Sequence, residues 1–311
     1  MQEKDKIGKI LEDYNDVFAD IYNTLVFHKE YLAEENLRDG PTESIYKAAS
    51  GRLAGQQRDI LKCYMENCLS IVSLGTENQV TIDAAMTVRI MGYDYSEYRR
   101  MLQQKQPIRP VITIVLNFSD RRWNKPKSLF GMMNIPAELK KYVQNYKIKV
   151  YDIAFLEDEV IDRFTSDFRI IARFFKDKRL NRNTTLYDDR TPIRHVEEVL
   201  QFISIFSRDK RYEQAYTEKI KEKIAKGEEI YMCYIADEIE KKGIERGRKE
   251  GMEKGMEKGM KKGMEKGMEK GLSALVASLK PFMTDFQQLY QAVIKNEIYQ
   301  NVTQAQVKKY Y

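Results

Sequence analysis

The chain has 311 residues, of which 11% are aromatic and 32% are charged, with 53 Lys and Arg against 47 Asp and Glu. The aromatic content excludes a disordered chain, and no run of about 18 apolar residues is present that could form a transmembrane helix. The three cysteines have no CxxC spacing and the first residues lack an apolar signal core, so we expect a cytoplasmic protein without membrane contact. The small excess of positive charge is compatible with a polyanionic partner.

The N-terminal segment has the pattern of an amphipathic helix. Apolar residues recur at helical spacing from about residue 5 to 27. Asp16, Asp20 and Asn23 lie three and four residues apart, so they form a polar stripe along this helix. We interpret that stripe as a solvated face.

The middle of the chain alternates between strand and helix patterns. A connector without a clear period reaches about Gln56, and residues 58–79 then predict two strands joined by a turn at Glu66–Asn67. Residues 82–102 have helical spacing. The β-branched run at 111–118 is typical of a strand buried on both faces.

The remaining patterns complete an α/β fold. Residues 137–146 predict a helix, 148–153 a strand, and 165–235 a set of helices without further strands. Alternating strands and helices favour an α/β fold with a mixed sheet. We therefore expect a core over residues 1–160 and a helical subdomain over 161–240.

A low-complexity repeat follows at residues 241–272, where glycine recurs at every fourth position, mostly in G-M-E-K units. Each glycine inside a helix costs about 1 kcal/mol relative to alanine, so a lone helix is marginal. The methionines predict a self-association or partner helix, and a solvated spacer is the alternative. The last segment, 273–311, predicts a short helix near 285–297 and a capped terminal turn from Thr303.

The strand pair at 58–79 carries the candidate chemistry. Asp59 lies on the first strand, and the second ends in Glu77-Asn78-Gln79. Because side chains alternate along a strand, Glu77 and Gln79 share a face and Asn78 points the opposite way. An acid that faces an acid-x-amide is suited to a hard divalent cation, with the backbone carbonyl of Asn78 as a further oxygen ligand.

The candidate site admits further residues. Asp20 or Asp16 of the first helix is a candidate to complete the metal shell, and Gln79 is a candidate to orient the attacking water. A metal held by Asp59 and Glu77 would lower the pKa of a bound water and polarise a phosphodiester oxygen.

Other catalytic schemes have little support in the sequence. The two histidines, His28 and His195, lie far apart and outside any motif, and no glycine-rich nucleotide-binding loop occurs. We interpret both histidines as structural.

Several motifs in order resemble one known family. They are F-A-D-I-Y-N-T-L-V-F (18–27), R-D-I-L-K (58–62), L-G-T-E-N-Q (74–79), M-T-V-R-I-M-G-Y-D (86–94), P-V-I-T-I-V-L-N-F (110–118), W-N-K-P-K-S-L (123–129) and G-E-E-I-Y-M-C (227–233). Together they resemble the Rpn family of recombination-promoting nucleases, also labelled transposases, within the PD-(D/E)XK superfamily. The resemblance extends from about residue 14 to the glycine repeat.

The resemblance implies a restriction-endonuclease-like core and magnesium-dependent cleavage of DNA, with Mn²⁺ or Ca²⁺ as other divalent ions. It assigns the catalytic positions to Asp59, Glu77 and Gln79, and matches Asp20 to an acidic position of the first helix. The superfamily consensus has lysine where this chain has Gln79. Glutamine can orient a water but cannot give a full positive charge to the transition state.

Two functional hypotheses follow. The first is a metal-dependent endonuclease acting on double-stranded DNA, with Arg58 and Arg89 as candidates to position the phosphate backbone. The second is a nuclease fold with weak or no cleavage that serves as a DNA-binding or assembly module, because a fold alone does not guarantee its chemistry. In either case the repeat tail is a candidate homo-oligomerisation element.

Overall fold

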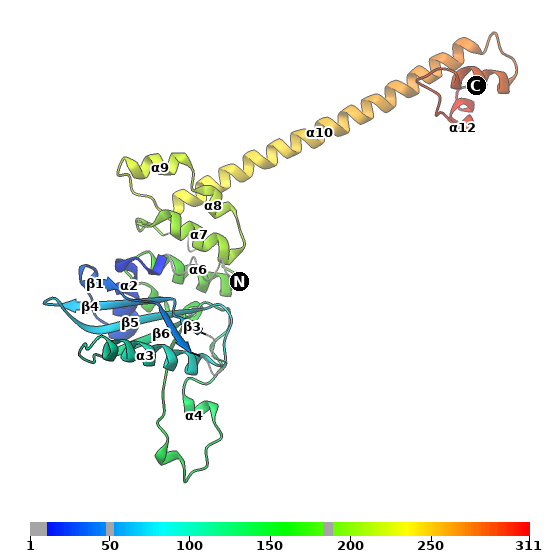
Figure 1. The fold of residues 1–311 in the computed structure, drawn as a ribbon. Coiled ribbons are helices and arrows are strands. Elements are labelled where there is room, and N and C mark those ends of the chain that lie inside the picture. The colour runs from blue at the N-terminus through cyan, green and yellow to red at the C-terminus, as the bar shows by residue number, and fades with distance from the viewer. Residues whose placement is uncertain (1–10, 48–52, 183–188) are drawn as a thin grey trace. The chain divides into compact units, whose positions relative to one another are not determined.

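The computed structural model describes residues 11–47, 53–182 and 189–311 (Figure 1). The chain divides after Ile239 into two compact units. The first part of the predicted N-terminal helix lies outside the described residues. None of the helices in the described part of the chain is both long and apolar enough to span a bilayer.

A five-stranded mixed sheet lies at the centre of the first unit (Figure 1). Its order is β1–β4–β5–β6–β7, with antiparallel pairing from β1 to β5 and parallel pairing from β5 to β7. Strands β2 and β3 form a separate antiparallel pair inside the predicted connector, which has no clear period that could indicate them. The strands are β1 Leu37–Asp39, β2 Glu43–Lys47, β3 Leu53–Gln57, β4 Ile60–Glu66, β5 Leu69–Gln79, β6 Val111–Asn117 and β7 Lys149–Asp152.

Helices cover both faces of this sheet, and β6 shows why. Ile114 and Leu116 belong to the main hydrophobic cluster with helix α2 (Asn15–Tyr22). Val115, which points the opposite way, packs in a second cluster with helix α3 (Met86–Gln103). A strand buried on both faces needs apolar residues at every position, and this confirms the prediction from the β-branched run.

The β4–β5 hairpin turns at Asn67 and Cys68, one residue later than predicted. Both residues have positive φ, 47° and 66°. Two-residue hairpin turns of type I′ require this conformation at both central positions, and asparagine adopts it more readily than most residues. The turn is therefore centred on Asn67 and Cys68, because asparagine tolerates positive φ.

The other elements of the first unit are mainly helical after β7, as predicted, and they share the main hydrophobic cluster with the sheet. Phe118 at the end of β6 contacts Phe168, Phe175, Phe202 and Phe206. The short helices of the first unit are η1 Asn23–Phe27 (a π-helix), η2 Glu34–Asn36, α4 Leu129–Met132, η3 Lys140–Tyr142, η4 Ile153–Phe155 and α5 Asp158–Ile161. The later helices are α6 Phe168–Leu180, α7 Val196–Ser207, α8 Arg211–Ala215 and α9 Glu218–Ala225.

The helix predicted at 137–146 is wrong. Only the single turn η3 forms there, and the apolar residues Leu139, just before it, and Tyr142, its last residue, are 53% and 73% exposed. A short helix is marginal in water unless tertiary packing buries one of its faces. Here no such burial occurs.

The repeat forms part of one continuous helix, α10 (Met232–Leu279), which begins in the first unit and extends through the second. In the second unit its last turns pack with α11 (Phe286–Ile294) and α12 (Gln304–Lys308) through a small core that includes Val276, Leu289 and Val307. Thr303 caps α12 with a full capping box, as predicted. The predicted α/β fold with a mixed sheet, helical segment and long tail helix is thus confirmed.

Candidate functional site

The ends of β4 and β5 bring the predicted acids together. Ile60 pairs with Thr76, and this register sets Asp59 beside Glu77 just beyond the paired residues. The backbone N–H of Asn78 donates a hydrogen bond of 2.7 Å to Asp59 Oδ2. This contact fixes the Asp59 carboxylate against the last residues of β5.

Glu77 is buried, at 2% exposure, and faces helix α3. Arg89 of α3 donates to Glu77 Oε1 at 2.6 Å, and also to Tyr93 Oη and Asp83, both at 3.1 Å. Burial is the largest influence on Arg89 and opposes its charge, but Glu77 together with Tyr93 and Asp83 outweighs it, so the pKa of Arg89 is raised. Burial, then the charge of Glu77 and more weakly that of Asp59, raise the pKa of Tyr93, while Arg89 opposes this rise.

Gln79 shares the face of Glu77, as strand alternation predicts. Its Nε2 donates to the backbone carbonyl of Asn78 at 2.9 Å and to Glu77 Oε1 at 3.3 Å. The amide therefore contacts two of the candidate metal ligands.

Glu12 is a site residue that the sequence did not indicate. It is fully buried, and Asn78 Nδ2 donates to its Oε2 at 2.8 Å. Burial raises the pKa of Glu12 well above its usual range; the Asn78 hydrogen bond opposes this rise, and the charge of Asp59 adds to it. Tyr14 has extended backbone and interrupts the helix between Glu12 and α2, so the helical period of the stripe could not predict where Glu12 points.

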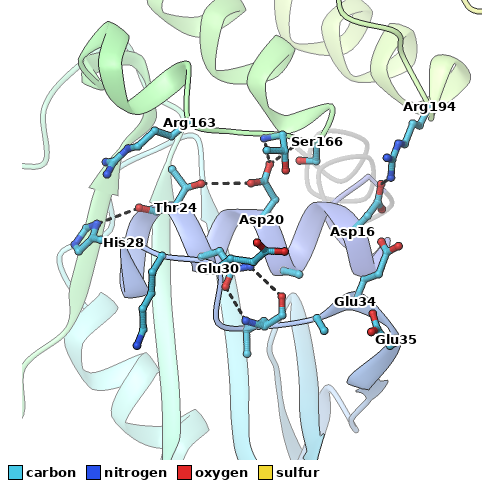
Figure 2. A pocket seen from close by; sticks show the side chains of 16 residues that line it. Asp16, Asp20, Thr24, His28, Glu30, Glu34, Glu35, Arg163, Ser166 and Arg194 are labelled. Atoms are coloured by element: carbon cyan, nitrogen blue, oxygen red, sulfur yellow. Dashed lines mark hydrogen bonds and ion pairs between the residues drawn. The ribbon is translucent and has the colours of Figure 1, made fainter.

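Asp20 faces a different part of the first unit (Figure 2). Its Oδ2 accepts hydrogen bonds from the backbone N–H groups of Thr165 and Ser166, at 2.9 and 2.7 Å. It lines a pocket of about 610 Å³, and none of Asp59, Glu77 and Gln79 lines that pocket. Asp20 is thus bound by the backbone before α6, and Glu12 is the acid that binds the Asn78 side chain.

Asp16 also lines that pocket (Figure 2). Its carboxylate lies 3.1 Å from His195 Nε2, and the His195 ring stacks on Tyr14 at 3.7 Å. The stripe that we interpreted as solvated is instead a docking face, because Asn23 likewise binds the backbone of Tyr31 and Leu32.

Arg58 lies inside the first unit, contrary to the expected phosphate contact. It is 3% exposed, and its Nη2 donates to Asp94 at 3.0 Å. Gly75 leaves the space for its guanidinium, since a Cβ there would lie 2.7 Å from Arg58 Nη1. The Arg58 guanidinium is therefore buried in an ion pair with Asp94. The side chain of Arg89, the other predicted phosphate contact, is 38% exposed.

Part of the chain matches one known protein family. Residues 64–198 match the family model described as "Putative transposase, YhgA-like". Over these residues the chain is similar to that family. No curated protein and no solved structure matches the chain.

The YhgA-like region contains Glu77, Gln79 and Arg89, whereas Asp59 and Glu12 precede it. The site is therefore built from both sides of the matched boundary. β5 and α3 supply the YhgA-like part, and the start of β4 and the N-terminal segment supply the rest.

The donor set at this edge of the YhgA-like sheet fits a hard cation. Two carboxylates, of Asp59 and Glu77, and the Asn78 carbonyl are oxygen ligands of the kind that Mg²⁺ prefers. In the described ranges, no group of three or more His, Cys, Asp or Glu side chains is arranged to hold a metal. Mg²⁺ commonly keeps several waters, so two carboxylates and a carbonyl suffice only with water or substrate oxygens.

Proposed function

We propose that this chain is a magnesium-dependent endonuclease that hydrolyses phosphodiester bonds in double-stranded DNA, with Mn²⁺ or Ca²⁺ as other ions for the same site. The observation that carries the proposal is the 2.7 Å contact between Asn78 N and Asp59 Oδ2, which sets two acids side by side at one edge of a mixed sheet. The YhgA-like match supports it, since transposases act on DNA. The cytoplasmic location stays a prediction from the sequence.

In this proposal the acids Asp59 and Glu77 and the carbonyl of Asn78 hold the cation. When bound, Mg²⁺ would lower the pKa of a water and polarise a phosphate oxygen. The Gln79 amide, now on the Asn78 carbonyl at 2.9 Å, turns from that carbonyl to hydrogen-bond and orient the attacking water. Its neutral side chain supplies orientation and no net charge.

Arg89 has two roles in this proposal. Without a cation its guanidinium balances the buried charge of Glu77 at 2.6 Å. A cation on Glu77 takes over that function, and the partly exposed Arg89 then becomes able to contact a DNA phosphate. Arg89 thus couples the metal to the DNA backbone.

Glu12 acts as a positioning residue. Its hydrogen bond with Asn78 Nδ2 holds the Asn78 side chain on the opposite face of β5, so the Asn78 carbonyl keeps its direction. Asp20 has a structural role instead, through its two hydrogen bonds to the backbone before α6.

Plasmid cleavage tests the proposal. Supercoiled plasmid with magnesium should be nicked or linearised by the wild type and left intact by the Asp59→Ala/Glu77→Ala double variant. A matched double variant of exposed acids, Glu34→Ala/Glu35→Ala, should cut like the wild type. Equal cutting by the wild type and the Asp59/Glu77 variant would show that another centre, or a contaminant, is responsible.

Two observations favour the second function, a DNA-binding or assembly module without cleavage. Glu77 already has a cationic partner in Arg89, and Gln79 occupies the position of the superfamily lysine. Isothermal titration calorimetry separates the two functions. No heat from Mg²⁺ or Mn²⁺ at millimolar concentration, together with retained DNA binding, would assign the second.

We also propose that the repeat helix associates with a second copy of this chain. Met252, Met256, Met260 and Met264 are 66–72% exposed, and nothing lies within 4 Å of a Cβ built on the glycines between them. Ridges of side chains four residues apart pack into the grooves of a crossing helix. Methionine ridges beside glycine grooves on one helix are self-complementary in this sense.

A further inference from the structure

The connection between β6 and β7 carries a concentration of positive charge. Over residues 119–149 it has eight basic residues and only two acids, Asp120 and Glu138. Every one of the basic side chains is exposed. They are Arg121, Arg122, Lys125, Lys127, Lys140, Lys141, Lys147 and Lys149. We refer to residues 119–149 as the basic arm.

The base of the basic arm is fixed to helix α3. Trp123 packs in the second hydrophobic cluster with Met86 and Ile90 of α3. Thr87 Oγ1 donates to the Pro126 carbonyl at 3.0 Å. Because α3 also carries Arg89, the arm is anchored on the helix that faces Glu77.

The arm also leaves the sheet beside the candidate site. Gln79 and Asn117 are paired at the ends of β5 and β6, and Phe118 N donates to the Gln79 carbonyl at 2.8 Å. The basic arm therefore begins two residues after the partner of Gln79. Its first cations, Arg121 and Arg122, follow at once.

Beyond this base, the outgoing and returning segments of the arm are joined by backbone hydrogen bonds. Leu129 N donates to the Tyr146 carbonyl at 3.0 Å, and Ile148 N donates to the Lys127 carbonyl at 2.9 Å. The segment beyond this closure, marked by α4 in Figure 1, extends away from the sheet. Its tip has Lys140 and Lys141 next to the 73% exposed Tyr142.

We propose that the basic arm binds the phosphate backbone of the duplex that the candidate site cleaves, an inference that rests on the proposed function. Phosphates attract cations without regard to sequence and release counterions on binding. An exposed arm with excess positive charge fits that partner, and its anchoring next to Gln79 and Arg89 continues the DNA-facing edge. The apolar tip residues would then lie against a groove or the sugar edges.

Salt dependence of DNA binding tests this proposal. Binding of a labelled duplex of about 30 base pairs is measured by fluorescence anisotropy in EDTA, with the full chain, at several salt concentrations. Each lost phosphate contact should reduce the slope of log K against log salt by roughly 1. Lys140→Ala/Lys141→Ala at the tip and Lys125→Ala/Lys127→Ala at the base should each reduce it by roughly 2 and weaken binding equally for unrelated sequences.

A matched control removes the same charge elsewhere. Lys258→Ala/Lys266→Ala replaces two exposed lysines of α10 and should leave the slope unchanged. An unchanged slope in both arm variants, or an equal reduction in the α10 variant, would overturn the proposal. Loss of binding to phosphatidylserine vesicles with unchanged DNA binding would assign the arm to a membrane surface instead.

The test of the basic arm can fail independently of the proposed nuclease function. If the wild type binds DNA through the arm but never cuts plasmid in magnesium, the nuclease function fails and the arm's role stands. If the wild type cuts and the arm variants bind and cut like it, the arm's role fails alone. Far-UV circular dichroism of each variant checks that the fold is retained.

Discussion

Arg89 Nη2 lies 2.6 Å from Glu77 Oε1, so a buried acid at the candidate metal site is neutralised by a guanidinium that is itself 38% exposed. A buried carboxylate needs a compensating charge. The same carboxylate can therefore be satisfied by Arg89 or by a cation, and the two compete.

This competition predicts the behaviour of Arg89→Leu. Without metal the variant should lose about 1–3 kcal/mol of unfolding free energy, because Glu77 is left buried without its guanidinium partner. Mn²⁺ should restore much of this loss, since a ligand that binds only the folded state stabilises it. Thermal melts with and without Mn²⁺ measure both effects.

Arg100→Leu is the control for Arg89→Leu. It removes a comparable ion pair, to Glu97 at 2.7 Å, on the same helix. It should be destabilised without rescue by Mn²⁺. Equal metal-induced shifts for both variants and the wild type would show that Arg89 does not compete with a cation at Glu77.

The pair of His195 and Asp16 predicts a pH dependence of stability. Burial opposes protonation of His195, but the hydrogen bond and charge of Asp16, with the charges of Asp167 and Glu198, raise its pKa above 6.5. This stabilisation is therefore fully present below pH 6.5 and is lost as pH rises through the folded-state pKa. Burial opposes ionisation of Asp16, but His195 and Arg194 lower its pKa below 3.8, so its contribution is lost only as pH falls through that lowered value.

His195→Gln tests this dependence. The difference in unfolding free energy between wild type and variant should be largest near pH 5–6 and should shrink toward pH 8. Urea denaturation at several pH values measures it. A difference that stays constant across this range would show that protonation of His195 does not contribute.

Two glycines of α10 predict opposite effects of alanine. A Cβ at Gly263 meets nothing within 4 Å, so Gly263→Ala should stabilise the helix by about 1 kcal/mol. A Cβ at Gly271 would collide with Tyr299 Oη in the small core, so Gly271→Ala should destabilise by about 1–3 kcal/mol. Amide hydrogen exchange along α10 measures both, and a gain in protection for Gly271→Ala would contradict the packing around Tyr299.

Self-association through α10 predicts a change in mass. Met256→Gln/Met260→Gln/Met264→Gln removes the apolar ridge and should lower the molar mass in light scattering after size exclusion. Lys254→Gln/Lys258→Gln/Lys262→Gln, on the same helix, should leave the mass as in the wild type. A mass unaffected by the methionine changes would leave the repeat as a spacer.

Local patterns were enough to predict three strands of the sheet. The run at 111–118 predicted β6, and the pattern around 58–79 predicted the β4–β5 hairpin. Both rest on nearest-neighbour chemistry, namely side-chain alternation and a short turn. The helix predicted at 137–146 failed because its apolar residues Leu139 and Tyr142 are exposed, and helical period without a packing partner is insufficient.

The residues of the candidate site also differ in whether the sequence could predict their positions. The side-by-side placement of Asp59 and Glu77 follows from one antiparallel register, which a hairpin sequence can indicate. Glu12 could not be predicted in this way, because it lies 66 residues from Asn78 in the chain and is separated from α2 by the break in the helix at Tyr14. For Asp20, the sequence could show a polar stripe but not the backbone of residues 165 and 166 that it binds.

By itself the sequence determined which residues alternate, which segments are apolar enough to be buried, and where a hairpin brings two acids to one edge. Only the tertiary structure decided which partner each buried polar group meets: Arg89 for Glu77, Asp94 for Arg58 and Asn78 for Glu12. The physical reason is range. Alternation and turn geometry act between neighbours in the chain, whereas a buried charge is satisfied by whichever partner packing brings to it.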